Sequence, residues 1–217
     1  MASGLGQVEM ITVDADVRRT KADGGPVESA RYWLDADRPG LELLRARFVT
    51  HAFPRHTHED HFVLGVVEQG TQECRTAGRR EDFPAGTVIL LNPSVPHTGR
   101  SLYPEGYTYR ALYPDLAFVE RFQEARAGGK GMGMPPRFRS PYRFYDPALA
   151  GRLLRLHGVL ESGAVESRLR QDTQLFVLMQ ELFERFGEAR RGAESGDEKA
   201  GREPVAVRRV RSGWIRR

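Results

Sequence analysis

Between residues 29 and 113 the chain consists of short runs of β-branched, aromatic and aliphatic residues, and this pattern constrains the fold more than any other feature. Pro, Gly and Asp separate the runs, and no helical period lies between them. Strands spaced so closely must pair antiparallel, which predicts a sandwich or a barrel. The expected strands are Ala30–Leu34, Leu41–Val49, Phe62–Glu68, Thr71–Thr76, Thr87–Leu91 and Tyr107–Leu112.

The period changes after residue 145. Asp146-Pro147 predicts a helix start, with Asp as the N-cap and Pro at the first helical position. One apolar stripe follows, which consists of Leu149, Leu153, Leu156 and Leu160. His157 lies outside this stripe, so we expect it on the exposed face of the helix. A second helix is expected from about 165 to 186, with Gly187 ending it. Its wide apolar face comprises Leu169, Leu175, Phe176, Leu178, Met179, Leu182, Phe183 and Phe186.

Three segments lack this regularity. Residues 1–28 show no clear period and predict a flexible arm. Residues 188–203 are polar, glycine-bearing and aperiodic, which is typical of a linker. Residues 204–217 begin like another helix that has nothing to pack on.

Composition excludes several classes of protein. The chain has 217 residues, of which 40% are hydrophobic and 29% are charged, enough for one hydrophobic core. No apolar run approaches the roughly 20 residues that a membrane span needs, and no secretory signal is recognisable. A single cysteine, Cys74, expected to be an inert small side chain on a strand, allows no internal disulfide. We therefore expect a cytoplasmic protein without a membrane partner.

The basic charge is concentrated at the end of the chain. The net charge is +4, and the last ten residues contain five arginines, so the remainder carries 4 − 5 = −1. The bulk of the chain therefore has no electrostatic signature of nucleic-acid binding.

Three histidines form the one constellation that suggests chemistry. His56 and His58 are two residues apart, so in an extended segment both imidazoles point to the same side. His97 follows the apolar strand 87–91 and the turn Asn92–Pro96. Two readings stay open: the trio lines a pocket, or it holds a divalent ion such as Zn or Ni. Of the other histidines, His51 and His61 are expected at the surface or at the mouth of the pocket.

The order His-x-His, strand, Gly, Pro-x-Gly, strand, Pro turn and His resembles the paired motifs of the cupin barrel. In metal cupins a glutamate follows the second histidine by four or five residues, where this chain has Phe62 and Val63. Glu59 has the opposite parity and is a poor substitute. Ser94 stands where the second motif has glycine.

A narrower resemblance covers about residues 30–187. This part of the chain is similar to the sensor domain of AraC-type transcription regulators. The segments that carry the resemblance, in the order found in that family, are Pro54–His58, Val63–Gly70, Ala85–Thr87, Asn92–Gly99, Tyr107–Arg110, Tyr113-Pro114 and Asp146–Ala150. In that family a cupin-like barrel binds a small effector, the following helices commonly mediate dimerisation, and a C-terminal helix-turn-helix module reads DNA. Residues 205–211 are similar to the opening helix of that module.

The resemblance implies a mainly β fold with C-terminal helices. The flexible arm (1–28) precedes a cupin-like barrel (29–145), a helical dimerisation segment (146–187), a linker (188–203) and the start of a truncated DNA-binding domain (204–217). The function implied is that of a sensor without catalytic activity, which needs no cofactor. The alternative is a small metal-dependent cupin enzyme, an oxygenase or isomerase.

Each expected role has its own residues. The effector pocket is assigned to His56, His58, His97, Tyr107 and Tyr109, and a metal, if bound, to the three histidines. A homodimer surface is assigned to Leu175, Met179, Leu182, Phe183 and Phe186. Weak, non-specific DNA contact is assigned to Arg208, Arg209 and Arg211.

Overall fold

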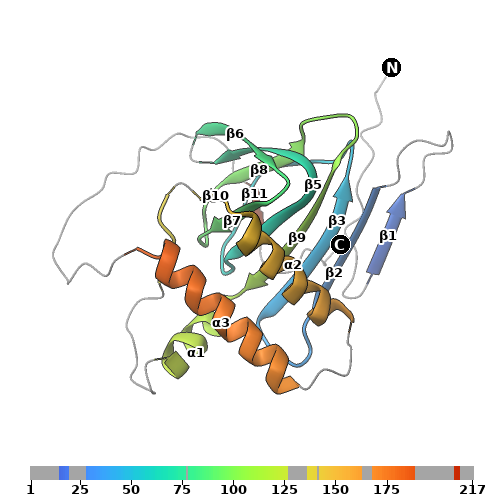
Figure 1. Ribbon diagram of the computed structural model, residues 1–217. Coiled ribbons are helices and arrows are strands. Elements are labelled where there is room, and N and C mark those ends of the chain that lie inside the picture. Colours follow the sequence, from blue (N-terminus) through green and yellow to red (C-terminus); the bar gives the residue numbers. More distant parts are fainter. Residues whose placement is uncertain are drawn as a thin grey trace.

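The computed structural model describes residues 15–19, 28–76, 78–126, 136–140, 142–162, 168–188 and 208–210 (Figure 1). Its strands are β1 (Ala15–Arg19), β2 (Glu28–Leu34), β3 (Leu41–Phe48), β4 (Ala52–His58), β5 (Val63–Thr76), β6 (Arg79–Pro84), β7 (Thr87–Leu91), β8 (His97–Ser101), β9 (Tyr107–Pro114), β10 (Arg143–Tyr145) and β11 (Arg208–Val210). Its helices are α1 (Leu116–Arg126), α2 (Pro147–Ser162) and α3 (Arg168–Phe186). No helix in this described part is long and apolar enough to cross a membrane.

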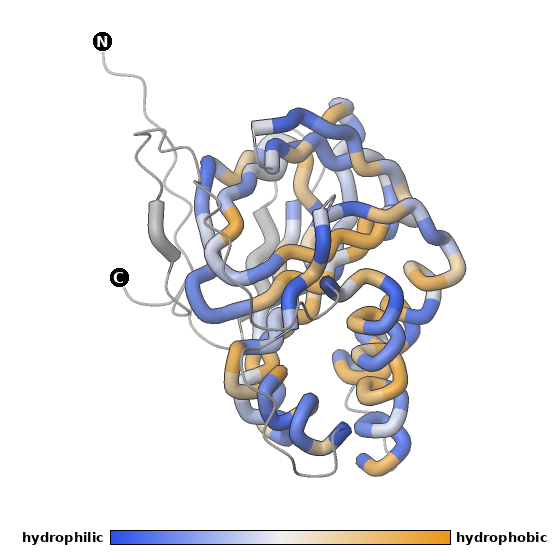
Figure 2. Tube along the Cα trace, turned by 90° about the vertical axis from the view of Figure 1, so that its left-hand side faces the viewer, coloured by the Kyte–Doolittle hydropathy of each residue, from blue (hydrophilic) through white to orange (hydrophobic). Residues whose placement is uncertain are grey.

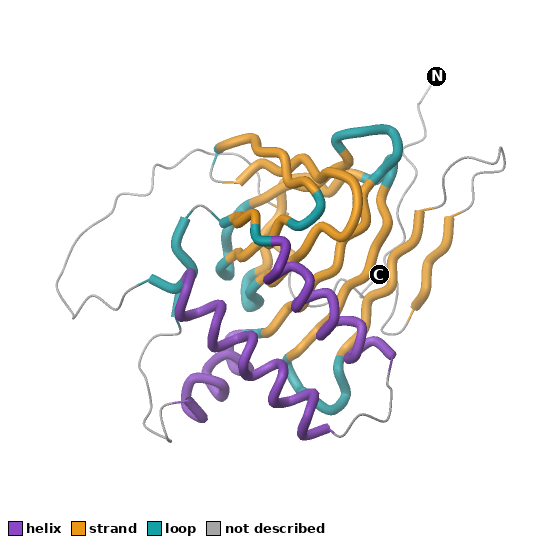
Figure 3. The backbone as a smooth tube through the Cα atoms, in the orientation of Figure 1, coloured by secondary structure: helices purple, strands orange, loops and turns teal. Residues whose placement is uncertain are grey.

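The strands form two sheets that share β5. In the first sheet the pairing order is β1-β2-β3-β9-β5-β7-β10, all antiparallel. In the second sheet β5 pairs with β6 and β8, β8 pairs with β4, and β11 adds to β4 in parallel. The mainly β architecture with following helices is confirmed (Figure 3), but the sheets do not close into the expected barrel.

Strand β5 replaces two expected strands. The sequence predicts a turn at Gln69-Gly70, whereas the chain continues as one strand of 14 residues. The pairing with β9 shifts register between Val67 and Gln69, and Gly70 has a φ of 73°. A Cβ on Gly70 would lie 2.2 Å from the carbonyl oxygen of Gly106. The unpaired Glu68 therefore forms a bulge, and together with the left-handed Gly70 it redirects β5 from one sheet to the other.

Two apolar clusters lie on opposite sides of the first sheet. The interior cluster, between the sheets, consists of Ala46, Phe48, Val63, Val67, Cys74, Phe83, Ile89, Leu91, Tyr107, Tyr109, Ala111 and Tyr113. The outer cluster joins alternate residues of the same strands to α1, α2 and α3 (Figure 2). The predicted stripe of α2 is confirmed, since Leu149, Leu153 and Leu156 are each at most 3% exposed. Cys74 is buried, as expected.

Helix α3 corrects the expected dimer surface. All five residues assigned to it are between 0% and 7% exposed within a single chain, namely Leu175, Met179, Leu182, Phe183 and Phe186. The ring of Phe183 stacks on Phe138 at 4.7 Å, and Phe186 contacts Phe144 at 4.0 Å. These side chains hold α3 against its own chain. Leu169, expected on the same face, is instead 76% exposed.

Several elements were not predicted. Helix α1 follows Asp115, whose Oδ1 accepts a hydrogen bond from the Phe118 amide at 2.6 Å as an N-cap. The period of Val119 and Phe122 was a usable signal. Strands β4, β6, β8 and β10 are short or polar, so alternation alone did not reveal them.

The chain ends also differ from expectation. Within the expected arm, β1 pairs with β2. Where a helix was expected after Pro204, residues 208–210 form β11, which agrees with the β-branched Val205, Val207 and Val210. Arg211, most of the expected linker and the rest of both ends lie outside the described residues.

His157 is 1% exposed, which corrects the expectation of an exposed helix face. Its Nε2 donates to the carbonyl oxygen of Leu44 at 3.0 Å, and Arg110 donates to its Nδ1 at 3.3 Å. The ring also meets Trp33 edge-on at 5.4 Å. Because one nitrogen donates and the other accepts, the imidazole must be neutral. Burial, and then the charge of Arg110, lowers the pKa of His157 to about 4.

We expect His157→Leu to lower the free energy of unfolding by about 1–3 kcal/mol, because it leaves a buried carbonyl unpaired. The exposed Arg155→Ala on the same helix serves as the control and should change it by less than about 0.5 kcal/mol. The unfolded chain binds the histidine proton near pH 6.5 and the folded chain only near pH 4. Stability should therefore fall as the pH drops through this window, and less steeply in His157→Leu. Urea unfolding at several pH values measures both effects, and equal slopes would contradict the assignment.

Candidate functional site

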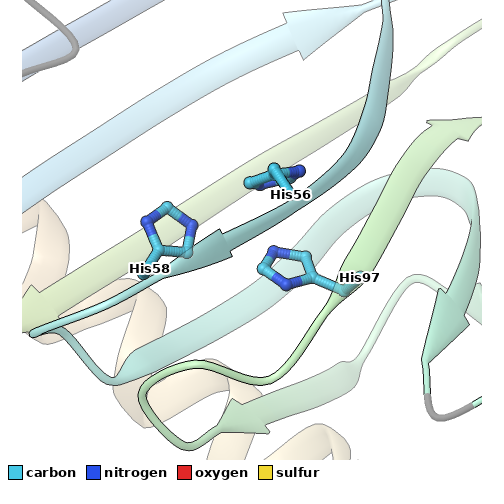
Figure 4. Close-up of side chains that lie close together, drawn as sticks. All are labelled: His56, His58 and His97. Atoms are coloured by element: carbon cyan, nitrogen blue, oxygen red, sulfur yellow. The ribbon is translucent and has the colours of Figure 1, made fainter. Parts of the chain in front are cut away.

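The three histidines expected to converge do so between β4 and β8 (Figure 4). His56 and His58 stand two residues apart near the end of β4, and His97 is the first residue of β8. The two strands are antiparallel, and His56 pairs directly with His97. The pairing shifts register between Phe53 and His56. Because of this shift the side chains of Phe53 and His56, three residues apart, both face the interior.

The distances within the trio are short. The ring centroids of His56 and His97 are 4.2 Å apart, and that of His58 lies 5.2 Å from His56 and 5.4 Å from His97. One nitrogen from each ring lies within 4.8 Å of the others. A single ion or one polar group of a ligand can contact all three at once.

Backbone carbonyls orient two of the rings. The Nδ1 of His56 lies 2.8 Å from the carbonyl oxygen of Pro54, and the Nδ1 of His97 lies 3.0 Å from that of Val95. A carbonyl only accepts, so each Nδ1 carries the hydrogen and each Nε2 carries the lone pair. Metal-binding histidines are typically oriented in this way by their second nitrogen.

The environment keeps the trio uncharged. Burial, together with the neighbouring His56, lowers the pKa of His97 to about 3. Burial also lowers the pKa of His58 well below its usual range, and His97 and His56 act in the same direction. At neutral pH both rings are therefore in the form that binds a metal ion.

The fold brings no carboxylate into the trio among the described residues, in agreement with the missing glutamate of the first motif. Three imidazoles suit Zn, Ni, Cu or Fe. Three protein ligands would leave a position for water or for a ligand.

The turn before His97 holds the two motifs together. The amide of Ser94 donates to the carbonyl oxygen of His58 at 2.7 Å. Ser94 has a φ of 63°, the left-handed region that favours the glycine found at this point of the cupin motif. This turn also borders an open cleft of about 500 Å³, which is lined by Glu59, Phe62, Pro93, Ser94, Val95, Pro96, Leu116, Pro136, Arg137 and Tyr142.

Tyrosines of β9 line the interior beside the trio. Tyr107 and Tyr109, both assigned to the effector pocket, share one face of β9 and are 1% and 7% exposed within the interior cluster. Tyr113 has the same parity but was missed; its ring lies 5.2 Å from that of His58. The ring of Tyr109 lies over Gly65. A Cβ at residue 65 would be 2.3 Å from the hydroxyl oxygen of Tyr109, so glycine is required at residue 65.

A second polar pair was not foreseen. His61, expected at the surface or mouth, is 5% exposed, and its Nε2 lies 3.7 Å from Oε2 of Glu42. Glu42 also accepts a hydrogen bond from Tyr32. Burial, with a smaller effect of Asp115, raises the pKa of Glu42 to about 7. His51, by contrast, is half-buried and packs on Phe53 at 4.6 Å.

The model of the AraC-like ligand binding domain matches residues 38–203, more than half of the chain. The chain belongs to this family. The match, together with the observed architecture, confirms the cupin-like fold and the resemblance to AraC-type sensor domains. No curated protein sequence matches the chain.

Several solved structures are similar to this AraC-like domain. KdgF from Halomonas sp. is 18% identical, with a TM-score of 0.37 over 48% of this chain and 93% of its own. A predicted oxalate decarboxylase from Thermotoga maritima is 17% identical, with a TM-score of 0.38, and the match covers 48% of this chain and 94% of that protein. A Cupin 2 conserved barrel domain protein from Salinispora arenicola is 19% identical, with a TM-score of 0.38 over 58% and 99%. At these low scores neither activity nor ligand is carried over to this chain.

Proposed function

We propose that this chain is the ligand-sensing and dimerisation part of an AraC-type transcription regulator in the cytoplasm, and that it is not an enzyme. The observation that carries the proposal is the convergence of His56, His58 and His97 inside an AraC-like ligand binding domain. In this proposal residues 29–145 bind the effector, residues 146–187 mediate dimerisation, and residues 188–203 lead to a DNA-reading module that begins near 204. Tyr107 and Tyr109 complete the pocket.

We further propose that the trio binds a divalent ion, zinc or nickel, which would anchor the effector. The donor set fits: the imidazoles are close together, two are oriented through Nδ1, and burial favours the neutral form. His56, His58 and His97 would hold the ion. When bound, the ion would supply an electrophilic centre for an oxygen atom of the ligand.

Zinc binding tests the metal site. We expect one zinc ion per chain, measured by calorimetry and by elemental analysis of protein purified without an affinity tag. His97→Ala should weaken the affinity by about 100-fold or more, because one of three ligands is lost. His51→Ala, which removes a histidine outside the trio, should leave it within about twofold. Absence of zinc from the native chain, or equal effects of the two variants, would refute the metal site.

The dimer we propose uses the exposed side of α3. Leu169 and Val177 are 76% and 57% exposed and are eight residues apart, which is about two turns of the helix. A separate groove of about 220 Å³ between α1 and α3 is lined by Phe118, Phe122, Leu175, Phe176 and Met179 together with the charged Arg38, Arg121 and Asp172. A second copy of α3 would cover the exposed Leu169 and Val177.

Light scattering at micromolar concentration should give twice the 24.5 kDa of one chain. Replacing both Leu169 and Val177 by Glu should yield single chains, because buried charges oppose association. The exposed Arg155→Glu on α2 should remain dimeric. A native mass of one chain would refute the dimer.

This chain alone is expected not to read a DNA sequence. Arg208, Arg209 and Arg211 supply attraction to phosphates, which carries no sequence information and weakens with salt. Fluorescence anisotropy with an operator and a scrambled duplex should show equal, weak binding that disappears when residues 204–217 are deleted. A tenfold preference for either duplex, about 1.4 kcal/mol, would contradict this and place a DNA-reading surface within the chain.

A further inference from the structure

The inner wall contributed by β5 changes from apolar to polar along the strand. Val63 and Val67, before the bulge, belong to the interior cluster. After the bulge the inward residues are Gln72, Cys74 and Thr76, which are 8%, 3% and 8% exposed. Thr76 pairs with His97. A row of buried polar side chains thus runs along β5 and ends beside the histidine trio.

Two polar atoms at the far end of this row have no partner within the described part of the chain. They are Oε1 of Gln72 and the hydroxyl oxygen of Tyr107, and both are fully buried. Tyr107 is 1% exposed and belongs to the interior cluster. Buried polar groups in native proteins are nearly always hydrogen-bonded, so two adjacent exceptions point to a missing partner.

The strand register makes these two side chains neighbours. Tyr107 pairs with Gly70, which has no side chain, and Gln72 is the next inward residue of β5. Such diagonal neighbours are within reach of each other when the side chains are long. The two unpaired atoms can therefore serve one ligand group.

Strand β8 shows where the Gln72 amide lies relative to the histidine trio. The Nε2 of Gln72 lies 2.6 Å from where a Cβ on Gly99 would stand, so a larger residue at Gly99 would displace this amide. Gly99 is two residues beyond His97 on the same side of the strand, a separation of about 7 Å. The ring of Phe53 lies between, 3.6 Å from the same Gly99 position and 5.7 Å from the His56 ring.

We propose that Gln72 and Tyr107 form a subsite for a hydroxyl group of the effector, at the end opposite the histidine trio. The amide oxygen of Gln72 only accepts, whereas the hydroxyl of Tyr107 both donates and accepts. A ligand hydroxyl can donate to the first and accept from the second, whereas a carboxylate cannot donate and an ammonium cannot accept. The effector class is a small organic acid that also bears a hydroxyl, with the acid group at the trio and the hydroxyl at this subsite. This inference rests on the proposed effector site at the trio.

The test uses the zinc-loaded full chain and two rigid probes that differ only in the hydroxyl, 4-hydroxybenzoate and benzoate. We expect 4-hydroxybenzoate to bind at least tenfold more tightly. In Tyr107→Phe and in Gln72→Leu this ratio should fall toward one. Tyr103→Phe, which alters a tyrosine that is 55% exposed, should keep the native ratio.

Melting temperatures without any probe provide a second measurement. Because both variants remove an unpaired buried atom, neither should melt below the native chain. A lower melting temperature for both would show that these atoms already have partners in the protein, and would overturn the subsite. Equal affinity of the native chain for the two probes would also overturn it, while leaving the effector site at the trio intact. If neither probe binds, the ligand class is refuted, and the zinc titration separately decides whether the trio is a binding centre.

Discussion

The candidate site depends on the pairing of β4 with β8. This pairing places His56 directly opposite His97, and the register shift at Phe53 turns both His56 and His58 toward the interior. One more residue in either strand would turn these side chains outward, because successive residues face opposite sides. The Ser94 amide fixes the approach by bonding to the His58 carbonyl, at the cost of a left-handed backbone conformation at a serine. The β4–β8 pairing and the turn that contains Ser94 therefore determine the geometry of the histidine trio.

Strand β5 connects this ladder to the rest of the fold. Its first half pairs with β9 and β7 under the helices, and its second half pairs with β8 and β6 beside the histidines. The bulge at Glu68 and the left-handed Gly70 allow one strand to serve both sheets. Because α2 and α3 pack on the outer face of the same sheet, the proposed dimer surface and the proposed effector pocket share a common wall.

The sequence predicted the elements whose period is long or whose motif is specific. The stripe of α2, the β region and the convergence of His56, His58 and His97 were all predictable, because parity and spacing determine which side chains share a face. The β5 bulge was not, since Gly70 in isolation indicates a turn as well as a bulge. Nor was the burial of His157, His61 and Phe183, which depends on partners distant in the sequence. An apolar face shows that a helix is covered, and only tertiary structure shows whether its own chain covers it.

The histidines illustrate why residue type alone does not assign function. His157 uses both ring nitrogens within the fold, donating to Leu44 and accepting from Arg110, so its role is structural. His56 and His97 each have Nδ1 bound to a carbonyl two residues earlier, which leaves Nε2 as the nitrogen with a lone pair beside two other rings. Burial keeps both kinds of histidine neutral at pH 7, so His157 serves as donor and acceptor within the fold, whereas the trio is in the form that binds an ion.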